Sequence, residues 1–213
     1  MLPLRPIWEQ EGTTALLCSA PYPAKEFPLT ASPSSPETAR DALRRATRNA
    51  HAIVDEAFGR FDLGEAASYR EFLTAHARIV PAVEAWLDAH QPEDMQEWSL
   101  VRRTPGILAD LAELEVEAPE TVAFDPPHDA ATACGVTYVM EGSRLGGTFL
   151  SRQIGPDLPK AYLGAPSQSA LWRDFLANLD RHLPTADAVE RACKAALDTF
   201  DVFRRAGAAT VRP

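Results

Sequence analysis

The sequence predicts an all-α fold, and three features of it support that prediction. Apolar residues recur at helical spacing along most of the chain, no segment shows the alternation of a half-buried strand, and no internal repeat is found. The 213 residues, 46% of them hydrophobic, suffice for one domain with a full core. A formal net charge of −9 argues against a nucleic-acid-binding protein. No apolar run approaches about 18 residues, so we predict no membrane span.

The first predicted helix follows a proline-rich start of the chain. Residues 1–34 lack helical periodicity, so we expect a tail or a loosely docked arm there, followed by one helical domain at 35–213. Ser35-Pro36-Glu37 is typical of a helix start, with a hydroxyl N-cap, a proline at the first position and an acid in the first turn. Small and apolar residues then keep a helical period until Gly59, where we expect the helix to end: Leu43, Ala46, Thr47, Ala50, Val54 and Phe58.

Helical periodicity continues through the rest of the chain. A second amphipathic helix is marked from Tyr69 to Leu87, and Pro81 is expected to bend it. The remaining predicted segments are helices at 104–114, 129–153, 167–182 and 187–205, and an irregular, proline-bearing stretch at 117–128.

The segment from Gly135 to Leu150 is the most unusual of these predicted helices. It holds Gly142, Gly146 and Gly147 in its interior, although each interior glycine costs roughly 1 kcal/mol relative to alanine. Gly142 and Gly146 are four residues apart, so they share one face and leave it without side chains. A flat partner lying on that backbone would explain the glycines. The alternative is a close crossing with another helix.

His51 lies among the apolar positions of the first predicted helix, with polar groups close to it. Asp55 follows four residues later, within reach of the imidazole, and Arg48 precedes it by three residues on the flank. Arg44 has nearly the same azimuth, about 10 Å along the helix axis. These groups suit haem, a planar and largely apolar ligand with a metal at its centre and two negative charges at its edge. The imidazole can bind the iron, the carboxylate can orient the imidazole, and the two guanidinium groups can pair with the propionates. The alternative is a core histidine beside surface arginines.

Three motifs follow one another in a specific order between Ser35 and Arg205. They are Leu-Arg-Arg-Ala-Thr-Arg-Asn-Ala-His at 43–51, Ile-Leu-Ala-Asp-Leu-Ala at 107–112 and Tyr-Val-Met-Glu-Gly-Ser-Arg-Leu-Gly-Gly at 138–147. In this order and spacing the chain resembles the haem oxygenase family, and more closely its bacterial branch associated with bacteriophytochromes. The resemblance implies a single-domain helical fold that holds haem between a proximal N-terminal helix and a glycine-kinked distal helix.

The resemblance also implies roles for individual residues. His51 looks like the proximal ligand of the haem iron, with Asp55 accepting a hydrogen bond from its second nitrogen. The other matches are Arg44, Arg48 and Tyr138, near the propionates, and Gly142, Gly146 and Gly147, on the distal helix over the haem. Mammalian relatives carry an aspartate after the first distal glycine, where this chain, like the phytochrome-linked branch, has Ser143. We expect Ser143 and ordered water to hydrogen-bond the bound oxygen.

The activity implied by the resemblance is the oxidative cleavage of haem to biliverdin, carbon monoxide and iron. It uses O2 and electrons from a ferredoxin or a reductase, and a bacteriophytochrome is an expected receiver of the biliverdin. One alternative is a non-catalytic haem carrier or sensor of the same fold. Another is a relative that binds two non-haem irons, but the chain lacks the repeated Glu-x-x-His pattern such a site needs.

Other polar residues have simpler expected roles. We interpret His76 as a hydrogen-bonded core histidine in preference to a second ligand, and Cys134 as a small packing residue in preference to a thiolate ligand. Cys18, Cys134 and Cys193 are isolated and odd in number, which favours a reducing cytoplasm. The basic residues Arg102, Arg103, Arg152, Lys160, Arg204 and Arg205 form either a patch for an electron donor or a solvated scatter of charges.

Overall fold

The computed structural model describes residues 37–95, 102–165 and 169–209. A boundary between Pro36 and Glu37 divides the chain into two units, and every described residue belongs to the second. The predicted arm at 1–34 therefore lies outside the described residues. Within the described ranges all regular elements are helices and no strand occurs, which confirms the predicted all-α fold. None of the described helices has the length and hydropathy needed to cross a membrane.

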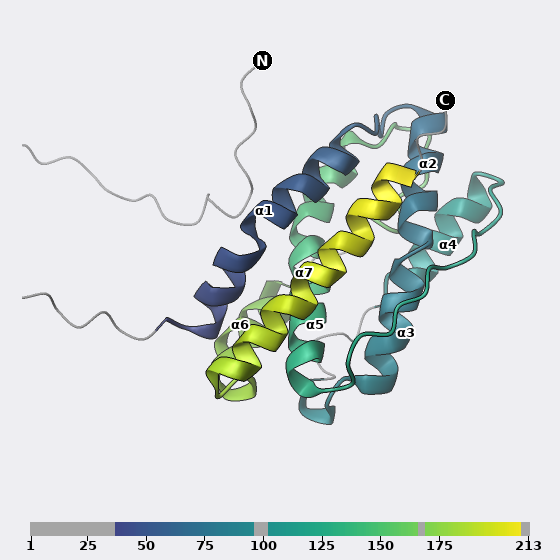
Figure 1. Ribbon diagram of the computed structural model, residues 1–213. Coiled ribbons are helices and arrows are strands. Elements are labelled where there is room, and N and C mark those ends of the chain that lie inside the picture. Colours follow the sequence, from purple (N-terminus) through teal and green to yellow (C-terminus); the bar gives the residue numbers. More distant parts are fainter. Residues whose placement is uncertain (1–36, 96–101, 166–168, 210–213) are drawn as a thin grey trace, which may run out of the picture. The chain divides into compact units, whose positions relative to one another are not determined.

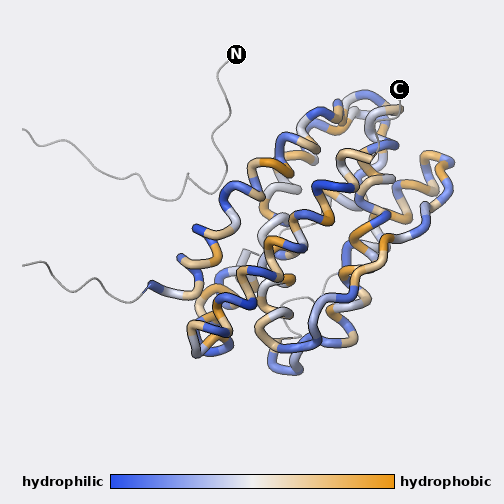
Figure 2. Tube along the Cα trace, viewed as in Figure 1, coloured by the Kyte–Doolittle hydropathy of each residue, from blue (hydrophilic) through white to orange (hydrophobic). Residues whose placement is uncertain are grey.

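α1 (Ala39–Gly59) begins later than predicted because Thr38 is its N-cap. Thr38 has an extended backbone, and its side-chain oxygen accepts a hydrogen bond from the backbone N–H of Asp41 at 3.1 Å. The predicted cap, Ser35, lies outside the described residues. The helix ends at Gly59, as expected, and Figure 2 shows hydrophobic and hydrophilic residues alternating around it.

The predicted second helix is two helices. α2 (Ala66–Ala77) and α3 (Val80–His90) are separated by two residues, and Pro81 lies in the first turn of α3. Proline has no N–H to donate to the carbonyl four residues earlier, and its ring crowds that carbonyl. Pro81 thus begins a new helix, and the prediction that it only bends a continuous one was wrong.

The later helices lie where the sequence predicted them, to within four residues at each described end. They are α4 (Thr104–Glu113), α5 (Ala130–Leu150), a short 3-10 turn η3 (Ser151–Gln153), α6 (Ser169–His182) and α7 (Ala186–Ala209). Asp129 caps α5, its carboxylate accepting hydrogen bonds from the backbone N–H groups of Ala131 and Thr132. The stretch at 117–128 contains no helix.

α7 packs along both α1 and α5, whereas α1 and α5 have little direct contact (Figure 1). A Cβ placed on Gly135 of α5 would lie 2.1 Å from the carbonyl oxygen of Ala192 in α7. A Cβ placed on Gly207 of α7 would lie 2.9 Å from the Phe58 ring of α1. Two glycines therefore bring α7 close to its neighbours, one on each side.

Candidate haem site

His51 of α1 forms a pair with Asp55. Its Nδ1 lies 2.9 Å from Oδ2 of Asp55, and its side chain is 37% exposed. The ring packs edge-on against Phe200 of α7, with the centroids 5.6 Å apart. Because Nδ1 is bound to the carboxylate, Nε2 is the ring nitrogen whose lone pair can bind a metal.

Tyr138 of α5 joins the two helices of the candidate site. It shares a hydrogen bond with the side chain of Thr47 in α1. Burial raises the pKa of Tyr138, and the Thr47 hydrogen bond and the charges of Arg40 and Arg44 oppose that rise. The structure therefore places Tyr138 within electrostatic reach of Arg44.

Arg44 and Arg48 are exposed on α1, the helix that carries His51. Arg45 lies between them in sequence but is committed elsewhere, since its guanidinium donates two hydrogen bonds to the carboxylate of Glu37 at 2.8 and 2.9 Å. Arg45 shares their helix and its guanidinium is bound to Glu37, so it is a control for the two predicted haem-binding arginines.

Gly142, Gly146 and Gly147 of α5 do not mark a close backbone crossing with another described helix. A Cβ on Gly142 would meet the indole of Trp172 at 3.4 Å, and one on Gly147 would meet the Leu163 side chain at 3.8 Å. A Cβ on Gly146 would meet nothing within 4 Å. The close backbone approach of α5 to α7 occurs instead at Gly135. Side chains therefore cover Gly142 and Gly147, and the glycine segment is open at Gly146.

Two large apolar side chains, those of Leu145 and Phe149, lie beside the open position at Gly146. Leu145 is 37% exposed and Phe149 is 43% exposed. With Gly142 and Gly146 they occupy positions i, i+3, i+4 and i+7, which form one stripe of a helix. An exposed apolar stripe with no side chain at its centre is a suitable surface for a flat apolar ligand such as haem.

Ser143 has different neighbours from those we expected. Its hydroxyl donates a hydrogen bond to the carbonyl of Met140 at 2.9 Å and accepts one from Nη1 of Arg103 at 2.8 Å. The Ser143 proton is therefore directed toward the backbone. Sequence analysis placed Arg103 in a possible basic patch and missed this contact, because no local pattern separates Arg103 from Arg102, which pairs with Asp88 nearer the surface.

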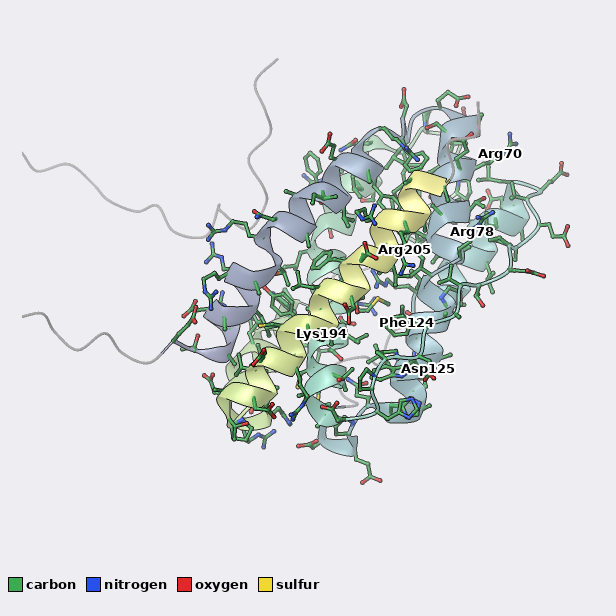
Figure 3. All side chains as sticks on the ribbon, in the orientation of Figure 1. Arg70, Arg78, Phe124, Asp125, Lys194 and Arg205 are labelled. Atoms are coloured by element: carbon green, nitrogen blue, oxygen red, sulfur yellow. The ribbon has the colours of Figure 1, made fainter. Side chains whose placement is uncertain are left out.

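The suggested basic patch does not form from these residues. Arg103 is only 8% exposed, and Arg204 and Arg205 both pair with Asp201. Figure 3 shows Arg205 on α7, together with Lys194. A scatter of paired and solvated charges describes these cations better.

The geometry of His76 and Cys134 supports structural roles for both. The ring of His76 is partly buried, with Nδ1 2.9 Å from the carbonyl of Phe72, and burial lowers the pKa of His76 to about 4. Burial raises the pKa of the Cys134 thiol to about 12, and its Sγ lies 3.7 Å from Sδ of Met95. Among the described residues, no three histidine, cysteine or acidic side chains gather as a protein-ligated metal centre requires.

Comparison with known proteins gives a family for this chain, although no family model matches it. It is similar to a haem oxygenase of Xanthomonas campestris pv. campestris (strain 8004), with 32% identity over 157 residues that cover 70% of this chain and 94% of that relative. The fold is similar to that of the NO- and CO-bound haem oxygenase from Neisseria meningitidis, with a TM-score of 0.65 and 22% identity over 81% of this chain and 92% of that one. The sequence relative, together with the shared fold, shows that the chain belongs to the haem oxygenase family.

Proposed function

We propose that the protein is a haem oxygenase that cleaves haem oxidatively to biliverdin, carbon monoxide and iron, using O2 and external electrons. The single observation that carries this proposal is the exposed apolar stripe of α5 at Leu145, Gly146 and Phe149, which is open at Gly146, in a chain of this family. A haem carrier would need affinity alone. The missing side chain at Gly146 also leaves room for O2 over the haem face, which a carrier would not need.

The residues of α1 would hold haem, the substrate, from its other side. His51 binds the iron through Nε2, and Asp55 keeps the imidazole oriented through Nδ1. Arg44 and Arg48 pair with the propionates as charge-assisted hydrogen-bond donors. Tyr138 adds a phenol beside Arg44 from the opposite helix.

The distal side is the exposed stripe of α5. Haem bound here supplies the iron that is reduced and that binds oxygen. Gly146 admits the haem face to the helix backbone because no side chain occupies that place, and Trp172 and Leu163 border this opening at Gly142 and Gly147. Leu145 and Phe149 exclude bulk water from the haem edge when it is bound. Ser143 belongs to this stretch, with its hydroxyl held by Met140 and Arg103.

The partners and the cellular setting follow from the motif resemblance. Serine at position 143, in place of an aspartate, supports membership of the branch linked to bacteriophytochromes, which would receive the biliverdin. A separate ferredoxin or reductase would deliver the electrons. Isolated cysteines, of which Cys134 and Cys193 are free thiols, support a reducing cytoplasm as the site of action.

The test is a spectrum recorded while the haem-loaded protein is supplied with a reductant and air. We expect loss of the haem absorption, growth of bilin absorption and release of carbon monoxide in proportion to haem consumed. A stable ferrous complex that survives both reductant and oxygen would identify a carrier or sensor and overturn the proposed activity.

A further inference from the structure

Arg103 is a buried guanidinium that touches the glycine-bearing part of α5. It precedes α4, and its Nη1 donates to the Ser143 hydroxyl at 2.8 Å while Nη2 lies 3.0 Å from the thioether sulfur of Met140. The residue is 8% exposed, and its Nε has no hydrogen-bond partner among the described residues. Burying an unpaired positive charge normally costs several kcal/mol. The neutral Ser143 hydroxyl and the weakly accepting Met140 sulfur offset only a small part of that cost.

The charges around Arg103 leave its guanidinium unneutralised by direct contact. Glu84 of α3 accepts hydrogen bonds from the backbone N–H of Arg103 at 2.6 Å and from Thr104, so its carboxylate serves the start of α4. Glu141 of α5 pairs with Arg144 at 2.7 Å. Within the described residues no ion pair joins the Arg103 guanidinium to a carboxylate. Its charge nevertheless reaches its surroundings, lowering the pKa of partly buried His76 in α2 and opposing the rise in the pKa of Tyr162.

Ser143 links this charge to the candidate haem surface. Neighbouring Cα atoms are about 3.8 Å apart, so the guanidinium lies within roughly 9 Å of the Cα of Gly142. Because Ser143 accepts from Arg103 and donates to the Met140 carbonyl, its hydroxyl presents a lone pair, and not its proton, to its remaining side. Positive charge on the distal side is therefore supplied by Arg103.

We propose that Arg103 is a positioning residue of the distal side: it fixes the orientation of the Ser143 hydroxyl and lends the glycine-bearing face of α5 a positive charge that stabilises negative charge developing there. This inference rests on the proposed function, since it takes that face to be the distal side of haem. It assigns the polar task we expected of Ser143 chiefly to a residue from another part of the chain.

A first experiment tests the juxtaposition without haem. Ser143→Cys, in a background where Cys18 and Cys193 are replaced by serine, places a thiol beside the guanidinium. The rate of its alkylation against pH should give a thiol pKa about 1 to 2 units below the ordinary 8.5. Leu145→Cys, an exposed site two residues further along α5, is the control and should titrate near the ordinary value. Equal thiol pKa values in the two variants would overturn the proposal.

A second experiment tests the effect on haem itself. Water bound to ferric haem iron ionises with a visible spectral change, and a nearby cation lowers the midpoint of that change. Arg103→Gln should raise the midpoint by about 1 pH unit, from a unit charge roughly 10 Å away at an effective dielectric constant near 20. Arg103→Lys keeps the positive charge, so its midpoint should stay close to that of the wild type. Arg102→Gln removes the same charge one residue earlier, where it pairs with Asp88, and should leave the midpoint within about 0.2 unit of the wild type.

The outcomes separate the two proposals. A midpoint that moves equally in Arg103→Gln and Arg102→Gln, or in neither, shows that Arg103 is only structural. If the neutral variant does not fold, the thiol titration and the Arg103→Lys midpoint still decide, because a lysine that retains charge must keep the wild-type midpoint. Failure of the wild-type protein to bind haem would overturn the proposed function, and the distal role with it, while the thiol titration would still report the Arg103–Ser143 contact.

Discussion

Asp55 determines which nitrogen of His51 can bind a metal. The carboxylate holds Nδ1 at 2.9 Å, and the Phe200 ring supports the imidazole from α7. A ligand that is already oriented loses less rotamer freedom on binding, so the pair favours a defined bond through Nε2.

Replacing His51 tests this assignment directly. We expect His51→Ala to lose the spectrum of histidine-ligated ferric haem and to lose turnover, although haem can still be retained by apolar contacts and propionate pairing. His128→Ala is the matched control, because His128 also pairs with an aspartate, Asp125, at 2.7 Å but lies outside α1. A wild-type ferric spectrum in His51→Ala would exclude the ligand role.

The arginines of α1 permit an equally sharp comparison. Arg44→Ala combined with Arg48→Ala should weaken haem binding by about 100-fold or more, since each of the two charged hydrogen bonds contributes about 1.5–3 kcal/mol. It should also change the biliverdin isomer, because haem free to rotate presents another meso carbon. The control is Arg45→Ala, whose guanidinium is already bound to Glu37. Haem titration and chromatography of the product are the measurements, and an unchanged affinity together with an unchanged isomer contradicts the assignment.

At the scale of elements, α5 carries glycines of two kinds. Gly135 is required by packing, because its missing Cβ is the space taken by the carbonyl of Ala192. Gly146 is not required by packing, since a Cβ there would meet nothing within 4 Å. Packing explains the first glycine, and bound haem is the explanation that we propose for the second.

The two glycines predict opposite results. Gly146→Leu should leave the melting temperature of the haem-free protein unchanged or raise it, since leaving glycine in a helix gains roughly 0.5–1 kcal/mol, yet haem turnover should be lost. Gly135→Ala should lower the apo-protein melting temperature, with near-normal turnover in the protein that remains folded. Both variants are measured for melting and turnover, and normal turnover in Gly146→Leu would defeat the distal assignment.

The sequence predicted these elements well where local chemistry decides them. The helices of the glycine segment and of the C-terminal part follow from apolar periodicity, and the irregular stretch at 117–128 follows from its prolines. Pro81 was misinterpreted because a proline at one position can bend a helix or begin one, and the packing around it decides. The Arg103–Ser143 contact joins residues 40 apart in sequence, which no periodicity reveals.

For the whole molecule, the partly buried His76 links stability to pH. The rings of Phe72 and Tyr162 surround its imidazole, and burial lowers the folded-state pKa of His76 from 6.5 to about 4. Between pH 6.5 and about pH 4, His76 is therefore protonated in the unfolded chain and neutral in the folded protein. Stability from this group is fully present above pH 6.5 and is lost as pH falls toward 4.

The free energy of unfolding should accordingly fall by up to about 1.4 kcal/mol per pH unit through that window from His76 alone. His182, whose pKa is also lowered by burial, adds a smaller loss in the same direction. Denaturant unfolding of the apo-protein at pH 7, 6, 5 and 4.5 is the measurement. His76→Leu should flatten the slope, and a slope unchanged by that substitution would contradict the role of His76.

The fit of Phe58 against Gly207 has a consequence for the spacing of the haem-facing helices. α1 and α5 have little direct contact, so α7 determines how far apart they lie. The contacts of His51 with Phe200 and of Phe58 with Gly207 advance together along both helices, so α1 runs parallel to α7, and the second contact lies about 10 Å along the axis from the first. A single methyl group added at Gly207 would push α1 outward and change the width available to haem. In a genetic screen such a variant would score as a loss of activity, although the altered atom belongs to none of the groups that hold haem.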